Sequence, residues 1–346
     1  MLLTKIYRAL TTLSILLLVY SCGQSDFNQD LLKPNAKNNL GDLLVVLDKK
    51  YWENSAISHA VKSNFGKLIT TTPLPYEPEF KLEFVDQAGV NSIIKKHKTI
   101  LIININSQEK NNSKIAPSPI YDLWAREQIV YKINATSQKN AVTILNHDAD
   151  SLKLGINQFY YHSILASAGE NKAANNVLRN NHGLTLQLPS NMKIKKMSAD
   201  FTWLNRTKIK KDQNGDHEIQ QGIFVYSLPY IDESIFSKEK QLFLRDSMLK
   251  KYVHGKVKNS YMVTRRDDLA NCETKAQLIN STYVNAVRGL WRMENDKMGG
   301  PFLSISTLSK DQRRVVFIEG YVYAPNFKKR TLLKEMEAVL HSFKME

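Results

Sequence analysis

The chain has 346 residues, with 48 Lys and Arg against 33 Asp and Glu, and its formal net charge at pH 7 is +15. Its hydrophobic content of 42% is ordinary for a globular protein, and no apolar run reaches the length that a helix needs to span a bilayer. The lysines are scattered, without an Arg-rich stripe interleaved with aromatics, so we expect no nucleic-acid partner.

Residues 1–21 are predicted to be a lipoprotein signal peptide. Lys5 and Arg8 precede an apolar run of about twelve residues, which is shorter than a membrane span. The run ends at Ser21-Cys22-Gly23, and small residues flanking a cysteine resemble a bacterial lipobox. We therefore expect cleavage before Cys22, which would then carry diacylglycerol and palmitate. The alternative is an uncleaved signal anchor with an incidental cysteine.

Residues 22–40 are polar, rich in Asn and interrupted by Pro34, which predicts a flexible tether between the lipid and the folded protein. Removing residues 1–21 removes two basic residues, so 46 basic residues against 33 acidic ones leave a net charge near +13. Once Cys22 is lipidated, Cys272 is the remaining thiol and no internal disulfide is expected.

Residues 41–181 are predicted to form an N-terminal lobe in which strands alternate with helices, an α/β pattern. A long helical segment closes this lobe, and we expect breaks near Asp148 and Gly169. The expected strands are 41–48, 80–86, 99–106 and 128–135, and the expected helices are 51–66, 89–98 and 137–181.

Residues 182–346 are predicted to form a C-terminal lobe with a largely antiparallel sheet covered by helices. The strands alternate apolar and polar residues, and Asn214-Gly215 is a strong hairpin signal. The fold class is therefore α+β with two mixed lobes. The expected strands are 183–189, two within 198–230, 281–294, 300–309 and 313–325, and the expected helices are 232–255 and 328–344.

Motifs of known chemistry are absent from the sequence. It contains no G-x-S-x-G, Walker A, G-x-G-x-x-G or H-E-x-x-H motif, and its eight histidines are dispersed without metal-ligand spacing. We therefore assign no catalytic residue, no metal site and no cofactor.

The segment R-G-L-W-R-M-E-N-D-K-M-G-G-P-F, residues 288–302, is the most unusual in the chain. The Gly299-Gly300 amides could form an anion-binding nest, and Trp291 between Arg288 and Arg292 could face a sugar or a carboxylate. Trp203 on an earlier strand could line the same groove. The alternative is a tight connection between strands with Trp291 in the core.

Several segments between residues 122 and 330 together resemble a known family of Bacteroidota lipoproteins, the domain of unknown function 4837. These are LWAREQIVYKINA, FTWLNR, GIFVYSLPY, RDSMLKKYVHG, SYMVT, RGLWRMENDKMGGPF and EGYVYAPNFKKR, in this order. The resemblance implies an exported lipoprotein and carries over no activity and no site residue. In that phylum acidic residues after the lipidated cysteine accompany surface export, and here only Asp26 follows closely.

The sequence thus favours a lipid-anchored cell-envelope protein on the outer membrane, facing the periplasm rather than the cell surface. We expect a binding or scaffolding module whose partners are the membrane, through the lipid, and an envelope protein or an anionic glycan. The alternative is a hydrolase of envelope glycan or peptide with Glu294, Asp296 or Asp200 as acids. Exposure of both Trp203 and Trp291 in a concave groove would favour ligand binding. Burial of both, together with a flat apolar patch elsewhere on the surface, would favour a protein partner.

Overall fold

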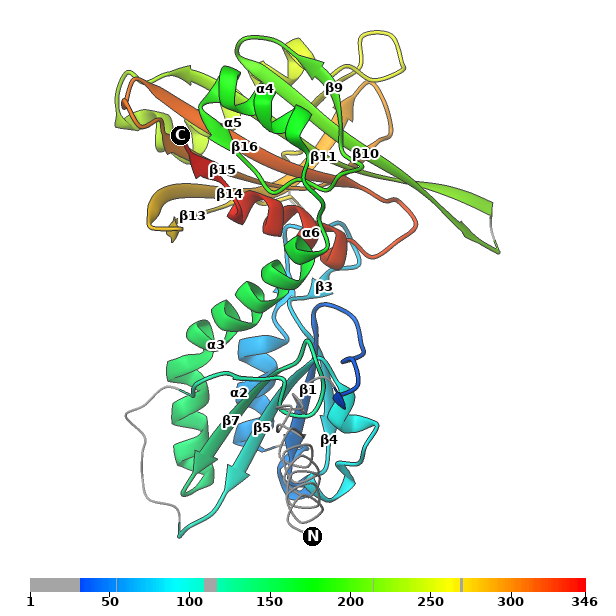
Figure 1. Ribbon diagram of the computed structural model, residues 1–346, viewed down its shortest axis with the longest axis vertical. Coiled ribbons are helices and arrows are strands. Elements are labelled where there is room, and N and C mark those ends of the chain that lie inside the picture. Colours follow the sequence, from blue (N-terminus) through cyan, green and yellow to red (C-terminus); the bar gives the residue numbers. More distant parts are fainter. Residues whose placement is uncertain (1–31, 54, 109–116, 214, 268–269) are drawn as a thin grey trace, which may run out of the picture.

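The computed structural model describes residues 32–53, 55–108, 117–213, 215–267 and 270–346 and shows two lobes stacked along the long axis of the molecule (Figure 1). Each lobe combines a sheet with helices, so the expected α+β class with two mixed lobes is confirmed. Cys22 and the predicted signal peptide lie outside the described residues. No helix in the described ranges is long and apolar enough to cross a membrane.

The N-terminal lobe contains a five-stranded sheet in the order β4-β1-β5-β7-β6, in which β6 alone is antiparallel. The strands of this sheet are β1 (Asp42–Leu47), β4 (Lys81–Val85), β5 (Thr99–Ile105), β6 (Ile120–Tyr121) and β7 (Ile129–Ala135). A two-stranded ribbon, β2 (Leu68–Ile69) with β3 (Glu77–Pro78), extends from this lobe toward the other (Figure 1).

Two helices cover one face of this sheet, α2 (Ala56–Phe65) and α3 (Gln138–Ala166). Alternate strand residues such as Leu43 and Val45 point to these helices and form one core cluster with them. The helices begin where side chains cap them: Ser55 Oγ accepts from Ser58 N–H at 3.1 Å, and Ser137 Oγ accepts from Asn140 N–H at 3.2 Å.

Two expected helices of this lobe differ in the structure. Helix α3 runs for 29 residues without the expected break at Asp148, which is buried within the helix and lies 2.8 Å from the ring of His147. The expected break near Gly169 does occur, between α3 and the next helix. In place of the expected helix over 89–98 the chain forms 3-10 turns at 87–89 and 94–96, from which Val90 and Ile94 pack on the sheet.

The C-terminal lobe contains an antiparallel eight-stranded sheet in the order β12-β14-β15-β16-β11-β10-β9, with β13 pairing along β14. Its strands are β9 (Lys193–Met197), β10 (Phe201–Asp212), β11 (Gly215–Pro229), β12 (Tyr261–Thr264), β13 (Glu273–Ile279), β14 (Thr282–Glu294), β15 (Gly299–Leu308) and β16 (Arg314–Tyr323). β10 and β11 form the long hairpin that the Asn-Gly pair predicts, and Gly215 has a φ of +115°.

Helices cover both faces of this sheet. One face packs against α4 (Lys172–His182) and α6 (Arg330–His341), through residues such as Leu204, Ile318 and Met336. The other face packs against α5 (Lys238–Tyr252), through an aromatic cluster that includes Trp203 and Phe317. Residues of opposite parity on each strand therefore build two separate cores.

The lobe boundary and several strands differ from expectation. Helix α4 was expected in the N-terminal lobe, but its Ala174 and Leu178 pack in the C-terminal core, so the connection between lobes lies at residues 167–171. The expected strand 183–189 shortens to β8 (Leu184–Thr185), which pairs with β17 (Lys344–Met345). β9, β12 and β13 were missed because they are short or charged edge strands.

Candidate functional site

The two tryptophans proposed to line a groove are buried. Trp203 is 6% exposed and Trp291 is 1% exposed. The Trp203 indole N–H donates to the Tyr321 hydroxyl at 3.1 Å, and the Trp291 indole N–H donates to the Val322 carbonyl at 3.2 Å. Both rings are thus packing anchors of the α5 face with satisfied polar ends.

The Gly299-Gly300 pair begins strand β15 with negative φ. A Cβ on Gly300 would lie 2.0 Å from the carbonyl oxygen of Val322, and a Cβ on Gly299 would lie 2.9 Å from that of Trp291. Close approach of backbones therefore accounts for both glycines. Arg292, on the neighbouring strand, is exposed and pairs with Glu294 at 2.6 Å.

A cavity of about 250 Å³ adjoins these tryptophans, and we call it the aromatic cavity. Its walls combine aromatic rings and methionines with a rim of charged residues, and Lys195 Nζ lies 4.0 Å from the centroid of the Trp203 ring. The lining residues that matter here are Trp203, Trp291, Tyr321, Tyr323, Met262, Met293, Met298, Lys195, Glu218 and Asp296.

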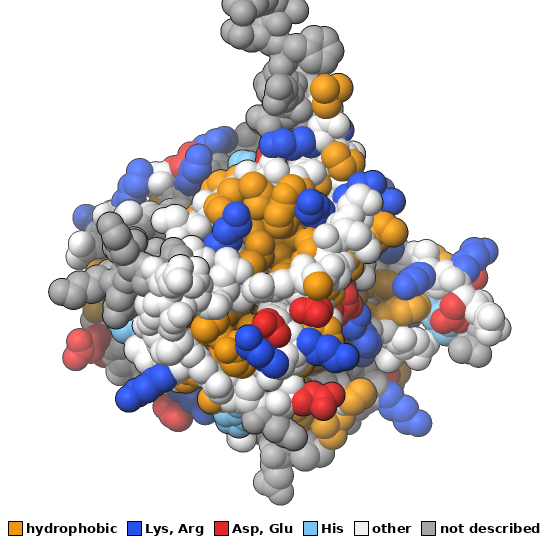
Figure 2. Space-filling view, turned by 90° about the horizontal axis from the view of Figure 1, so that it is seen from below, with side chains coloured by type: hydrophobic (Ala, Val, Ile, Leu, Met, Phe, Trp, Pro, Cys, Tyr) orange, Lys and Arg blue, Asp and Glu red, His pale blue; other side chains and the backbone are white. Residues whose placement is uncertain are grey.

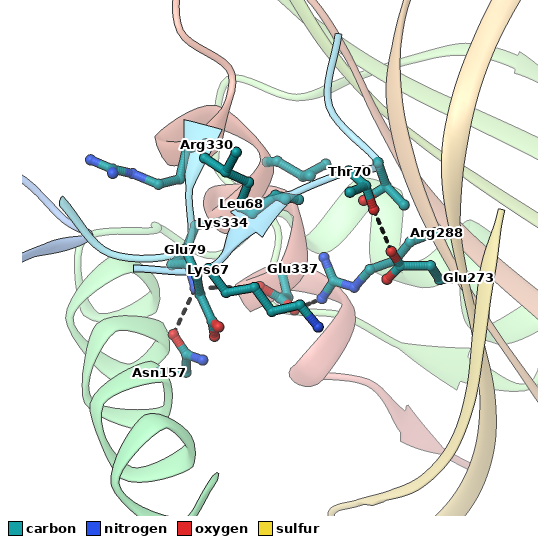
Figure 3. Close-up of a pocket in the computed structure, with 13 residues that line it drawn as sticks. Lys67, Leu68, Thr70, Glu79, Asn157, Glu273, Arg288, Arg330, Lys334 and Glu337 are labelled. Carbon is teal, nitrogen blue, oxygen red and sulfur yellow. Dashed lines mark hydrogen bonds and ion pairs between the residues drawn. The ribbon is translucent and has the colours of Figure 1, made fainter. Parts of the chain in front are cut away.

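Arg288 lies away from the other candidates, in a second cavity of about 250 Å³ between the two lobes, which we call the inter-lobe cleft (Figure 3). Figure 3 shows charged side chains from both lobes converging on it. The N-terminal lobe supplies Lys67, Thr70, Thr71, Glu79 and Asn157, and the C-terminal lobe supplies Glu273, Arg288, Arg330, Lys334 and Glu337.

Helix α6 positions half of this site. Arg330, Lys334, Glu337 and His341 follow one another at intervals of four, three and four residues, so they share one helical face. The opposite face carries apolar residues such as Met336, which pack on the C-terminal sheet. The polar face of α6 therefore meets the N-terminal lobe rather than solvent.

Lys334 is the most perturbed of these groups. Its ammonium donates to Asn157 Oδ1 at 2.6 Å and lies 3.8 Å from a Glu337 carboxylate oxygen. Burial, together with the nearby Arg288, lowers the pKa of Lys334 to about 7, although Glu79 opposes the shift. Burial, with Arg288 and Lys334, likewise lowers the pKa of His341 to about 4.

The remaining polar groups of the cleft are unevenly paired. Arg288 forms a close ion pair with Glu337, and Thr70 Oγ1 donates to Glu273 at 2.6 Å. Thr71 is 1% exposed, and its hydroxyl has no hydrogen-bond partner among the described residues. Lys67 is exposed at the cleft and forms no ion pair with a described residue. The cleft thus holds unused hydrogen-bonding capacity from both lobes.

The acids considered for a hydrolase are engaged elsewhere. Burial opposes ionisation of Asp200, but hydrogen bonds from Tyr252 and Ser198 and the nearby Lys251 ammonium lower its pKa to about 2. Asp296 accepts from the Lys297 N–H at 2.7 Å. In the described part of the chain no three His, Cys, Asp or Glu side chains group as metal ligands.

Sequence reasoning missed the inter-lobe cleft apart from Arg288. The polar stripe of α6 was visible as charges at helical spacing, but such a stripe ordinarily faces solvent. Nothing in the sequence shows that the second lobe covers it. Thr71 and Asn157 carry no distinguishing pattern at all.

Residues 171–342 match the family described as Domain of unknown function (DUF4837), and residues 36–167 match the one described as Domain of unknown function (DUF8532). A comparison with curated proteins gives no match.

Solved structures are only distantly similar, and at TM-scores this low they carry no functional argument. A point mutant of the protein Mog1 has a TM-score of 0.30 and 10% identity, over 47% of this chain and 90% of that one. The Saccharomyces cerevisiae Ran-binding protein Mog1p has a TM-score of 0.29 and 11% identity over the same shares. A Bacteroides thetaiotaomicron protein has a TM-score of 0.19 and 8% identity, over 47% of this chain and 45% of that one. Through the domain that forms its C-terminal lobe, the chain belongs to the DUF4837 family.

Proposed function

We propose that the protein is a lipid-anchored cell-envelope protein that binds a small carboxylate-bearing molecule in its inter-lobe cleft. The ligand class covers fragments of acidic envelope glycan and short peptides, which share the carboxylate. The anchor is Cys22, and the outer membrane, with the protein facing the periplasm, is the location that the sequence favours.

The observation that carries the ligand site is the pair of incompletely satisfied polar groups in the cleft. In its protonated form Lys334 has three N–H donors and one close acceptor, and the Thr71 hydroxyl has no partner among the described residues. A carboxylate could accept hydrogen bonds from both, and Lys67 and Arg288 add positive charge nearby. Sites of this kind occur preferentially between domains.

The charge balance of the cleft limits the ligand further. Glu79 and Glu273 also line it, so a ligand that carries only negative charge would meet repulsion. A molecule with a carboxylate at one end and donor groups, such as hydroxyls or an ammonium, at the other fits better. A uronic acid and a dipeptide both meet this description.

A hydrolytic function has less support from the geometry. Asp200 stays ionised because of its hydrogen bonds, and Glu294 is tied to Arg292, so neither is poised as a general acid. Burial of Trp203 and Trp291 excludes the proposed tryptophan groove and, with an apolar patch elsewhere, would favour a protein partner. The incompletely satisfied polar groups of the cleft instead support a small ligand there.

Titration calorimetry of the full-length protein in detergent, with glucuronate and dialanine as probes, tests the ligand site. We expect one of them to bind, and we expect Lys334→Met and Thr71→Val to weaken that binding by about tenfold or more, the value of one charge-assisted hydrogen bond. Lys328→Met, at an exposed lysine just before α6, should bind like the unmodified chain. Absence of binding by both probes, or equal affinity in all variants, would contradict the proposal.

A further inference from the structure

The sheet of the N-terminal lobe has a second face that no described α-helix covers; we call it the open face. It lies opposite α2 and α3 and carries the alternate strand residues, among them Val46, Ile100 and Val130. Parallel sheets are ordinarily buried on both faces. In the described ranges, only the 3-10 turns of residues 87–96 and the segment 120–124 pack on the open face.

This cover is incomplete. Several apolar residues on the face stay half-buried, among them Val85, Ile102 and Trp124, and Ile93 beside the turn is 76% exposed. Figure 2 views the molecule from below the N-terminal lobe and shows apolar side chains gathered in a patch with Lys and Arg at its border. A contiguous apolar surface with a polar rim is typical of an interaction site.

Lysines accompany the apolar residues of the open face. Lys132 follows Val130 by two positions on β7, so it projects from the same face, and it is exposed. Lys95 Nζ lies 5.7 Å from the centroid of the Trp124 ring. Glu83, an acid that projects from this face, is already paired with Lys81 at 2.5 Å. Protein surfaces that lie on anionic bilayers typically combine apolar side chains, tryptophan at the level of the headgroups and lysine near the lipid phosphates.

The described chain begins at the rim of this face. Lys33 Nζ donates to the Asp122 carbonyl at 2.7 Å, and Asn35 and Lys37 form bridges with Arg126 and His97. Cys22 precedes Leu32 by 32 − 22 = 10 residues, which span at most about 35 Å when extended. A lipid on Cys22 would therefore hold the open face within a short distance of the bilayer.

We propose that the open face rests on the anionic surface of the membrane in which the Cys22 lipid is inserted, with Trp124 in the headgroup region and Lys95 and Lys132 against lipid phosphates. This inference rests on the lipid anchor of the proposed function. A short tether makes docking intramolecular, so even weak contacts between face and lipid are populated. The inter-lobe cleft would then be held at a fixed height above the bilayer.

Fluorescence quenching of the full-length lipidated protein in vesicles of phosphatidylethanolamine and phosphatidylglycerol with brominated acyl chains tests this. We expect quenching that disappears in Trp124→Phe, because the other tryptophans of the chain do not lie on the open face. Lys95→Glu and Lys132→Glu should each lower the ratio of docked to undocked protein by about fivefold or more, from about 1 kcal/mol per basic residue near the surface. Charge reversals at the exposed Lys208 and Lys310 of the other lobe should leave it unchanged.

The outcomes separate the inference from the anchor. Protein that attaches to vesicles without Trp124-dependent quenching overturns the inference and leaves the anchor standing. Protein that does not attach at all overturns the anchor, and the inference with it. A photo-crosslinker in place of Ile93 that captures a protein rather than lipid in intact membranes also overturns the inference.

Discussion

Glu77 of the N-terminal lobe caps helix α6 of the C-terminal lobe, with its Oε1 accepting from the Lys329 N–H at 2.6 Å and from the Arg330 N–H at 3.3 Å. Helix α6 has no capping side chain of its own. Free N–H groups at a helix start need acceptors, and the helix dipole favours a carboxylate there. One residue, distant in sequence, therefore supplies the cap and joins the lobes.

Replacing Glu77 with Ala should lower the free energy of unfolding by about 1–2 kcal/mol, the value of a lost cap with a charge component. Denaturant titration measures this. Glu239→Ala, which removes an exposed carboxylate from the first turn of α5, is the matched control and should cost only about 0.3 kcal/mol. Equal losses of unfolding free energy for the two substitutions would show that the cap between the lobes does not stabilise the protein.

A buried ion pair should dominate the stability of the α5 face. Arg245 is 2% exposed, and its guanidinium donates to both oxygens of the fully buried Glu319 at 2.8 and 2.7 Å. Glu319→Ala leaves the buried Arg245 guanidinium with only its longer ion pair to Asp246 at 3.4 Å, so we expect a loss of about 3–5 kcal/mol. The exposed pair of Lys81 and Glu83 is the comparison, and Lys81→Ala should cost less than about 1 kcal/mol.

Stability should fall with acid because of a buried histidine. His182 bonds to the Ser227 and Thr202 hydroxyls at 2.9 Å each, and burial, aided by Arg314, lowers its pKa from 6.5 to about 4. Below pH 6.5 the unfolded chain binds a proton that the folded protein rejects, so stability declines as the pH falls from 6.5 toward 4.

The size of this effect follows from linkage and reaches about 3 kcal/mol at pH 4. Denaturant titrations at several pH values measure the slope, and His182→Gln should flatten it. His341 contributes a similar slope, because its pKa is also lowered to about 4. An unchanged slope in His182→Gln would assign the acid sensitivity to other groups.

Glycines beside the aromatic cavity should resist substitution. A Cβ on Gly222 would lie 2.2 Å from the ring of Tyr321, whose hydroxyl accepts from the Trp203 indole. Gly222→Ala should therefore displace that ring and destabilise the protein by about 1–3 kcal/mol, with a change in tryptophan fluorescence. Gly89→Ala, where the nearest atom is 3.6 Å away, should leave both readouts close to their original values.

The period-two alternation of side chains predicted the buried strands well, because alternate residues of each strand point into a hydrophobic core. Strand β16 and the long hairpin β10–β11 lie where alternation and the Asn-Gly turn place them. The edge strand β9 was not predicted, because its three lysines break the alternation of apolar and polar residues that marks a strand. Close backbone approach explains Gly299 and Gly300 of M-G-G-P-F, whereas Gly289 of R-G-L-W is crowded by the side chains of Cys272 and Phe302.

The candidate site could be predicted far less well than the fold. Of the residues proposed to bind a ligand, Trp203 and Trp291 became core anchors, and only Arg288 reached the inter-lobe cleft. That cleft exists because the polar stripe of α6 meets Asn157 of the other lobe. Packing of one lobe on another produces no periodic pattern in a sequence, so the sequence does not distinguish Lys334 from the other lysines of the closing helix.

Membrane attachment should depend on one sulfur atom. Two or three acyl chains on Cys22 would bind a bilayer firmly, whereas a single chain gives only marginal attachment. Cys22→Ala should therefore move the protein from the membrane fraction to the soluble fraction, because the docking of the open face alone would be weak without the tether. Cys272→Ala, at a buried thiol, is the matched control and should leave the protein in the membrane fraction. If Cys22→Ala stayed in the membrane fraction through a high-salt wash, an uncleaved apolar N-terminus would become the better explanation of the attachment.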